Sequence, residues 1–298
     1  MGIYMFFKTK QNLIYNLVFC ITFSLLLMIK SSVVTAAEPI RFGIMSLAQP
    51  ARIHKQWQPF VDYVSRKSGY EIEIVIPRGF KKIKNKITNK HVDFFYTNSF
   101  VFYRLNKAGK ALPLAQMQNL EGNIMSNSVI FVRSDSGINR LSDLKNNSVA
   151  FVSPAGAGGY LAPRALFFKQ GLNTKVDIKE DFTKNLSNSI HKVLLGDVGA
   201  ATMCGLNYKL MSKKLDTGEL KIIANSEEYP ENMIGIRPEV AISIRKKLAK
   251  VILEMPNDKE GKKVLTGMNG MKIQSFVKPS KVTTQRTREL INTAKMKK

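Results

Sequence analysis

The sequence predicts an α/β protein of two lobes with parallel-sheet cores, and three observations carry this prediction. Strand and helix patterns alternate from Pro39 to Ala108, and the same alternation begins again at Asn127. Helices that connect parallel strands cover both faces of such a sheet. The helical segments after residue 220 are too many for the second lobe alone. We therefore expect the chain to cross back to the first lobe, so that two crossings form a hinge.

The first half of the chain is expected to contain three strands, each followed by a helix. Trp57, Phe60, Val61 and Val64 recur at helical spacing, and the apolar residues of 71–76 alternate as in a strand. In chain order, the expected elements are 39–45, 57–67, 71–76, 80–89, 92–96 and 99–108.

The second half repeats the pattern and adds helices towards the C-terminus. The expected strands are 127–133, 148–152, 198–203 and 220–224, and the expected helices are 141–145, 160–170, 185–195, 238–255, 259–266 and 283 to the end. The expected domains are a first lobe from 38–117 plus 226–298 and a second lobe from 118–225.

The first 37 residues have the order of regions found in a secretory signal peptide. Lys8 and Lys10 precede an apolar stretch from Leu13 to Ile29, and the small residues of 35–37 follow it. We expect export, with cleavage after Ala37. An uncleaved N-terminal anchor stays open as the alternative, because the apolar stretch approaches the length that spans a membrane.

Composition excludes several classes of protein. The chain has 298 residues with 46 Lys and Arg against 22 Asp and Glu, a net charge of +24, and loss of residues 1–37 leaves +21. Two cysteines and three histidines do not support a disulfide scaffold or a Cys- or His-rich metal site, so no metal and no cofactor is expected. Export argues against nucleic acid as the partner of these basic residues. The densest basic run, 81–86, is expected to be the solvated face of a helix, and attraction to anionic solutes or lipid surfaces stays open.

Four loops follow expected strands and lead towards helices, where open α/β sheets bind ligands. The candidate ligand-binding residues in these loops are Ser46, Gln49, Tyr96, Thr97, Asn98, Ser99, Ser153, Ala155, Gly156, Ala157, Gly158, Gly159, Tyr160, Met203 and Cys204.

The loop from Ser153 to Tyr160 is the most informative of the four. Because its three glycines have no side chains, backbone N–H groups are exposed where a helix begins. Such donors bind a phosphoryl group or a carboxylate. The loop lacks the Lys-Ser/Thr pair of a Walker loop and the glycine spacing of a dinucleotide-binding loop. A tight turn without a ligand is the alternative.

The remaining candidates also have structural interpretations. Asn98 or Ser99 is expected to cap the following helix, and Trp57 is expected in the core. Cys204 is expected to be a buried, inert thiol. Because the sequence contains no Gly-x-Ser-x-Gly elbow, no His-Glu-x-x-His motif and no evident carboxylate pair, we do not expect an enzyme.

Several blocks of sequence resemble one family over nearly the whole mature chain. The blocks are 40–45, 57–64, 92–100, 141–145, 148–165 and 274–277. In these blocks the chain resembles the phosphate/phosphite/phosphonate-type solute-binding proteins of ABC importers, which have the two-lobed type II periplasmic-binding-protein fold. The resemblance implies that an anion is held at the Gly-rich loop and enclosed by the first lobe. Two departures stand out: 155–159 lacks the usual Ser/Thr residues, and 202–204 lacks the acidic residue common in phosphonate binders.

The function expected from these observations is capture of a small anionic solute, phosphonate- or phosphate-like, in the interlobe cleft of a periplasmic protein. Its partners are expected to be that solute and an inner-membrane ABC permease, with no nucleic acid. The protein is expected to be a monomer. It is expected to be tethered to the membrane only if the N-terminus is uncleaved. The alternative is an exported ligand-sensing subunit that signals to a membrane receptor kinase.

Overall fold

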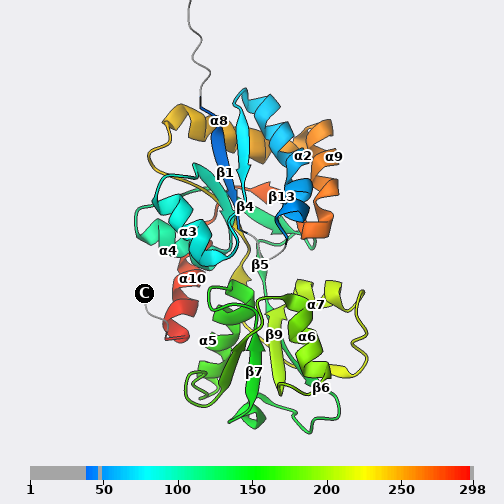
Figure 1. The fold of residues 1–298 in the computed structure, drawn as a ribbon. Coiled ribbons are helices and arrows are strands. Elements are labelled where there is room, and N and C mark those ends of the chain that lie inside the picture. The colour runs from blue at the N-terminus through cyan, green and yellow to red at the C-terminus, as the bar shows by residue number, and fades with distance from the viewer. Residues whose placement is uncertain (1–37, 46–48, 296–298) are drawn as a thin grey trace, which may run out of the picture. The chain divides into compact units, whose positions relative to one another are not determined.

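The computed structural model describes residues 38–45 and 49–295. The predicted signal peptide and Ser46 therefore lie outside the described residues. Within the compact unit from Pro39 onward, two larger sheets form the cores of two lobes, here called lobe 1 and lobe 2 (Figure 1).

Lobe 1 contains a six-stranded mixed sheet in the order β13-β4-β12-β3-β1-β2. Its strands are β1 (Ile40–Ile44), β2 (Ile72–Val75), β3 (Phe94–Thr97), β4 (Leu112–Asn119), β12 (Met233–Ile236) and β13 (Ile273–Val277). β1 is parallel to β2 and β3, as predicted, but β12 is antiparallel to β3 and β4. The sheet is mixed because β12, which follows the return from lobe 2, and β13 both run antiparallel to their neighbours.

Helices cover both faces of this sheet. They are α2 (Pro50–Ser68), α3 (Phe80–Thr88), α4 (Ser99–Lys107), α8 (Ile242–Glu254) and α9 (Lys259–Gly267). α2 begins seven residues before the predicted start because Pro50 is well suited to a first helical turn, and it ends at Gly69 with φ +78°. Trp57 is 2% exposed and packs edge-on against Phe42, which confirms its predicted core position.

Lobe 2 contains a five-stranded mixed sheet in the order β10-β6-β9-β7-β8. Its strands are β6 (Ser128–Arg133), β7 (Ser148–Phe151), β8 (Lys179–Phe182), β9 (Ala200–Cys204) and β10 (Leu220–Asn225). Its helical elements are the 3-10 turn η1 (Leu141–Leu144), the π-helical turn η2 (Ala157–Leu161), α5 (Ala162–Lys169), α6 (Leu186–Leu194) and α7 (Gly205–Met211). β7 is parallel to β8 and β9, so the carboxyl ends of β7 and β9 lie at the same edge.

The two lobes are connected by a two-stranded hinge. β5 (Met125–Ser126) pairs with β11 (Tyr229–Pro230) in antiparallel fashion. β5 takes the chain from β4 to β6, and β11 takes it from β10 back to β12. The predicted pair of crossings is confirmed.

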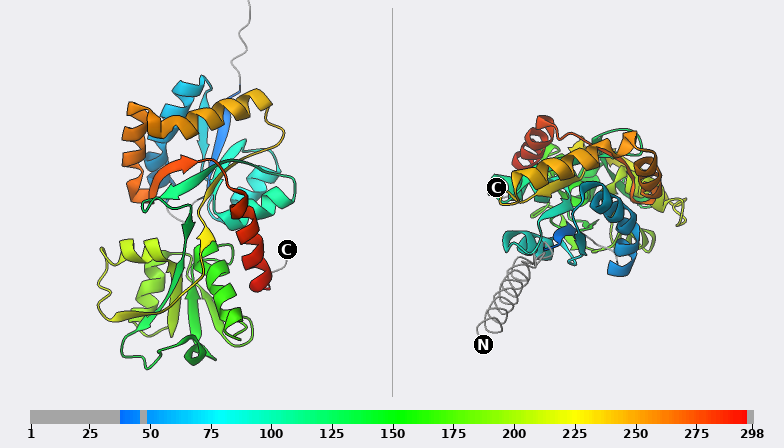
Figure 2. Two further views of the ribbon diagram at one scale, coloured as in Figure 1. Left: turned by 180° about the vertical axis from the view of Figure 1, so that it is seen from behind. Right: turned by 90° about the horizontal axis from the view of Figure 1, so that it is seen from above.

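The C-terminal part adds the 3-10 turns η3 (Met255–Asn257) and η4 (Asn269–Met271) and the helix α10 (Lys281–Thr293). α10 was expected to belong to the first lobe, but it contacts α4, the hinge strand β11 and α5 (Figure 2). Thr283 donates to Gln116 in lobe 1 at 2.7 Å, and Arg164 of α5 donates to the carbonyl of Ala294 just beyond α10 at 2.8 Å. The helix therefore bridges the lobes behind the hinge.

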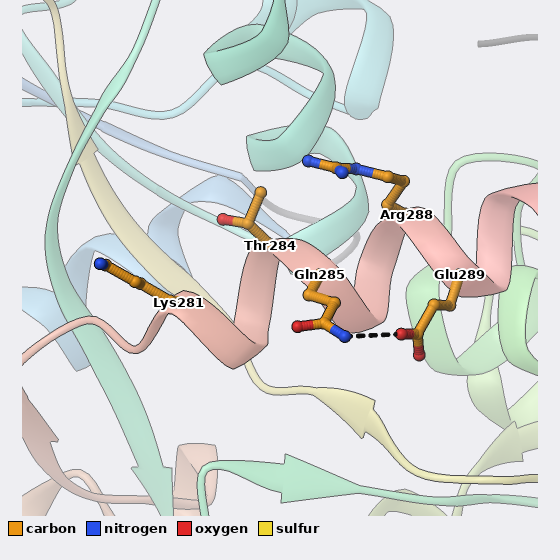
Figure 3. A pocket seen from close by; sticks show the side chains of 5 residues that line it. All are labelled: Lys281, Thr284, Gln285, Arg288 and Glu289. Atoms are coloured by element: carbon orange, nitrogen blue, oxygen red, sulfur yellow. Dashed lines mark hydrogen bonds between the residues drawn. The ribbon is translucent and has the colours of Figure 1, made fainter.

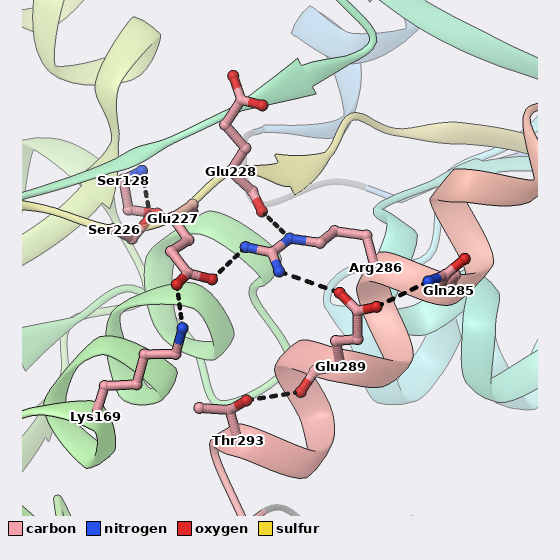
Figure 4. A network of polar contacts seen from close by, with 9 residues as sticks. All are labelled: Ser128, Lys169, Ser226, Glu227, Glu228, Gln285, Arg286, Glu289 and Thr293. Atoms are coloured by element: carbon pink, nitrogen blue, oxygen red, sulfur yellow. Dashed lines mark hydrogen bonds and ion pairs between the residues drawn. The ribbon is translucent and has the colours of Figure 1, made fainter.

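A polar network fixes α10 to the hinge (Figure 4). Arg286 donates to the carbonyl of Glu228 at 2.8 Å and pairs with the carboxylates of Glu227 and Glu289. Glu227 also pairs with Lys169 of α5, and the hydrogen bonds from Lys169 and Arg286 lower the pKa of the Glu227 carboxyl.

Candidate functional site

The four predicted loops follow strands that are paired within each sheet. β1 and β3 are parallel neighbours with Ile44 opposite Tyr96, so both strands end at one edge of the lobe 1 sheet. β7 and β9 are likewise parallel neighbours with Ala150 opposite Ala201. In each sheet, two strands that precede candidate loops thus end at the same edge, where ligands of open α/β sheets bind.

Asn98 connects the candidate loops of the two lobes. Its Oδ1 accepts a hydrogen bond of 2.8 Å from the amide of Val101, which makes Asn98 the N-cap of α4. Its Nδ2 donates at 2.9 Å to the carbonyl of Ala155, in the Gly-rich loop of lobe 2. The predicted capping role is confirmed, and the same side chain also makes a contact between the lobes.

The Gly-rich loop begins its helix earlier than predicted. The π-helical turn starts at Ala157, its N-cap is Gly156, and no side chain of the described residues caps it. The hydroxyl of Ser128 donates to the carbonyl of Gly158 at 2.6 Å, and that of Thr202 donates to the carbonyl of Gly159 at 3.0 Å. The turn is therefore held on β6 and β9, and the amides of its first turn receive no side-chain acceptor from the described residues.

Gly158 has a packing role that the sequence did not reveal. A Cβ atom at this position would lie 2.0 Å from the hydroxyl of Tyr229 in the hinge strand β11. Only glycine allows this approach, which seats the Gly-rich turn directly against the hinge. Tyr229 is 5% exposed, and burial raises the pKa of its hydroxyl far above the ordinary value.

A second uncapped helix start lies in lobe 1. α2 has Gln49 as its N-cap residue without a side-chain hydrogen bond to the helix, and Pro50 follows it. Gln49 is exposed, and its side-chain oxygen lies 3.5 Å from a guanidinium nitrogen of Arg78. The starts of α2 and of η2 therefore both keep backbone N–H groups that can bind an anion.

The other lobe 1 candidates use their polar atoms within the protein. The Tyr96 hydroxyl donates to the sulfur of Met117 at 3.0 Å and accepts from Asn232 at 2.7 Å, and burial raises its pKa. The side chain of Thr97 is fully buried, and the Ser99 hydroxyl donates to the carbonyl of Pro230 in the hinge at 2.7 Å.

The lobe 2 candidates divide into loop and core residues. Ser153 and Ala155 are partly exposed, and the Ser153 hydroxyl accepts from the amide of Ala155 at 3.4 Å. The Tyr160 hydroxyl instead donates to Glu180 at 2.7 Å inside lobe 2, and burial together with Glu180 raises its pKa. Met203 is fully buried, and Cys204 is a buried free thiol, as predicted.

A family model covers most of the chain. The family model described as "ABC transporter, phosphonate, periplasmic substrate-binding protein" matches residues 42–282, which is most of the chain. The chain belongs to this family. The phosphonate-binding family consists of transport proteins, which supports the main prediction and not the receptor-kinase alternative.

Relatives in this family and solved structures share the fold along most of the chain. The phosphonates-binding periplasmic protein of Escherichia coli is 24% identical over 266 residues, covering 86% of this chain and 78% of the relative. XAC2383 from Xanthomonas citri bound to ATP has a TM-score of 0.76 at 17% identity, over 87% of this chain and 98% of its own. PhnD1 from Prochlorococcus marinus in complex with methylphosphonate has a TM-score of 0.70 at 17% identity, over 86% and 97%. The chain has the type II periplasmic-binding-protein fold, as predicted.

The structure also reveals polar residues beside the hinge that sequence reasoning missed. Glu231 is 6% exposed, and its carboxylate accepts hydrogen bonds from Ser126 and Asn119. Asn232 follows it and donates to Tyr96. The hinge strands are two residues long, so no periodicity indicated them in the sequence.

The other surface features of the described residues do not have the form of a ligand-binding site. A hollow of about 610 Å³ lies on the exposed side of α10, where all its lining side chains come from that one helix (Figure 3). Across residues 38–45 and 49–295, no group of His, Cys, Asp or Glu is arranged to hold a metal ion. Over the same residues, no helix has both the length and the apolar character needed to span a bilayer.

Proposed function

We propose that this protein captures a small phosphonate- or phosphate-like anion between its two lobes and delivers it to an ABC permease of the inner membrane. The observation that carries the proposal is the hydrogen bond from Asn98 to Ala155, because it joins the N-terminal ends of helical elements from different lobes. An anion held there is bound by groups of both lobes, so capture favours their closed arrangement.

The anion-binding groups of the proposed site are backbone amides. The starts of η2 and α2 are uncapped by side chains of the described residues, and each supplies N–H donors and the positive end of a helix dipole. We place the ligand against the amides of Ala157 and Gly158, with Asn98 and Ser153 beside it, because the Gly156 amide already donates to the carbonyl of Ser153 at 3.0 Å. Tyr160 and Met203 are left out because their side chains are buried within lobe 2.

The end of β9 favours a ligand without a cationic group. Thr202 and Met203 are fully buried, and the Thr202 hydroxyl already donates to Gly159. This strand end therefore offers no carboxylate to an ammonium group, and an unpaired ammonium loses affinity on burial. Methylphosphonate, phosphite and phosphate fit these groups better than 2-aminoethylphosphonate does.

The setting of this function is also part of the proposal. The family is periplasmic, and we propose export through residues 1–37 with cleavage after Ala37. We propose a monomeric carrier without catalytic activity or nucleic-acid partner, with lobes divided at 117/118 and 225/226.

The test is a thermal-shift screen of the purified protein with phosphate, phosphite, methylphosphonate, 2-aminoethylphosphonate, a sulfonate and a carboxylate. A ligand at about 100 times its Kd stabilises the folded state by about 2.7 kcal/mol, which raises Tm by several degrees. We expect the largest rise with methylphosphonate, phosphite or phosphate. A flat response to every anion would overturn the proposal.

A further inference from the structure

The positive charge of the chain is unequally divided between the two parts of the sequence. Residues 38–117 and 226–298 together contain 30 Lys and Arg against 13 Asp and Glu. Residues 118–225 contain 13 against 9. The charge therefore belongs mainly to lobe 1, and ligand capture between the lobes does not account for it.

The helix α3 concentrates this charge on one surface. Ile83 and Ile87 are buried against the lobe 1 sheet, while its four lysines, Lys81, Lys82, Lys84 and Lys86, are exposed. The helix contains no acidic residue, and none of the four lysines is in an ion pair with a described residue. The buried pair orients the helix so that its lysines face solvent.

Three further lysines extend this surface along the edge of the sheet where β1, β3 and β4 begin. Lys90 follows α3, and Lys107 and Lys110 lie at the end of α4 and just beyond it; all three are exposed. The pKa of the Glu239 carboxyl is lowered by its own backbone amide and also by Arg237, Lys90 and Lys110, so these groups lie close to one another. We call the exposed lysines of α3 together with Lys90, Lys107 and Lys110 the lysine surface.

Two acids beside the lysine surface, Asp93 and Glu239, do not neutralise it. Asp93 is hydrogen-bonded by Arg41 and Arg237, and Arg237 also pairs with Glu239. These carboxylates therefore balance the two arginines and leave the lysines with net charge.

The N-terminal segment joins lobe 1 at this same edge. β1 begins at Ile40, only three residues after the predicted cleavage point, and the apolar stretch from Leu13 to Ile29 precedes it. During export this stretch is held at the membrane, and if uncleaved it stays there. Either way, the edge of lobe 1 that carries Lys90, Lys107 and Lys110 is the one nearest in sequence to the bilayer.

We propose that the lysine surface binds the anionic phospholipid surface of the membrane in which the permease resides. Clustered lysines attract a negatively charged bilayer over about one Debye length, roughly 8 Å at physiological salt, and each lysine close to the surface strengthens partitioning by about fivefold. Binding of this kind confines the carrier to the plane of its permease, and it does not depend on which solute the lobes capture.

The test is co-sedimentation with vesicles of phosphatidylcholine alone and of phosphatidylcholine with about 30% phosphatidylglycerol. The chain from Glu38 is used beside the full chain, because the apolar stretch from Leu13 to Ile29 would itself insert into vesicles. The shorter chain keeps its core, since all the hydrophobic clusters of the described residues lie from Ile40 onward. We expect binding to the anionic vesicles only, and loss of binding when salt is raised to about 0.5 M.

Two variants with equal loss of charge separate this surface from net charge. The first is Lys82→Gln with Lys84→Gln, Lys86→Gln and Lys90→Gln. The matched control in lobe 2 is Lys179→Gln with Lys184→Gln, Lys213→Gln and Lys214→Gln, all exposed. The first should bind anionic vesicles at least tenfold more weakly than the control, with both keeping the wild-type Tm. Equal weakening in the two variants, or equal binding to neutral vesicles, overturns the proposal.

Discussion

The side-chain amide of Asn98 lies 2.9 Å from the carbonyl oxygen of Ala155, and its own carbonyl oxygen accepts from the amide of Val101. One residue thus caps a helix of lobe 1 and binds the Gly-rich loop of lobe 2. If the lobes separate, as the proposed capture requires, the contact with Ala155 is lost while the cap is kept, so Asn98 favours the closed arrangement.

Asn98→Ala should therefore weaken ligand binding as well as lower stability. Loss of the cap costs about 1 kcal/mol of unfolding free energy, and loss of a hydrogen bond made only in the closed form should lower affinity about two- to tenfold. Urea unfolding and isothermal titration with the best anion of the screen measure the two effects.

Asn185→Ala is the matched control for this change. Asn185 caps the nine-residue α6 within lobe 2 through hydrogen bonds from Ser187 and Asn188. It should lose similar stability and keep full affinity. Equal affinity of the two variants would show that Asn98 is only a cap.

Ala157→Pro should remove one proposed anion donor while keeping the turn. Ala157 is the first residue after the N-cap, where proline is well accommodated, and Gly156 is extended at φ −76° and ψ 131°, as a residue before proline requires. Because the N–H group is lost, affinity should fall roughly fivefold or more. Ala157→Ser keeps the amide and should bind normally, and loss of affinity in both variants would point to packing instead.

Gly158→Ala should destabilise the protein by about 1–3 kcal/mol, because the new methyl group overlaps Tyr229. Gly267→Ala in α9 is the control, since nothing lies within 4 Å of a Cβ there. Combining Gly158→Ala with Tyr229→Leu should cost less than the sum of the single changes in urea unfolding. Strict additivity would contradict a direct contact.

Asp93→Asn should make stability less dependent on pH. Burial of Asp93 alone raises the carboxyl pKa, but hydrogen bonds from Arg41 and Arg237 outweigh it, and the net pKa is lowered. Such a carboxylate stabilises the fold fully at pH values above its pKa in the unfolded chain, which is about 3.9. This contribution is lost as the pH falls through its lower pKa in the folded protein. The variant should lose about 2–4 kcal/mol at pH 7 and progressively less below about pH 4.

Urea unfolding of both proteins from neutral to acid pH checks this prediction. Asp62→Asn, at an exposed position on α2, serves as the control for removal of one carboxylate and should cost little stability at pH 7. A difference between Asp93→Asn and the wild type that grows towards acid pH would have the wrong sign for the ion pairs described.

The elements with strong amphipathic patterns were predictable from sequence, and those set by long-range pairing were not. α3 lies within one residue of its prediction because Ile83 and Ile87 are its buried pair. β12 has only four residues, and its place between β3 and β4 depends on partners more than a hundred residues away. β8 was missed because its sequence, KEDF, is mostly charged.

The candidate site was predictable as a set of loops, but the direction of each side chain was not. The strand pattern placed Asn98 and the Gly-rich loop at strand ends, and the structure brings them into contact. The helix was expected to begin at Tyr160, yet the π-helical turn begins at Ala157 and carries Tyr160 into the lobe 2 core. Such a local change in helical geometry has no clear signature in the residue pattern.

The position of α10 has a practical consequence for observing ligand capture. Since α10 contacts α4, β11 and α5, the lobes cannot rotate without moving this helix against at least one of them. Lys295, just after α10, has its ammonium group 5.3 Å from the ring of Phe168 on α5. A fluorophore attached at position 295 is thus placed to report lobe closure optically, without any label at the binding residues.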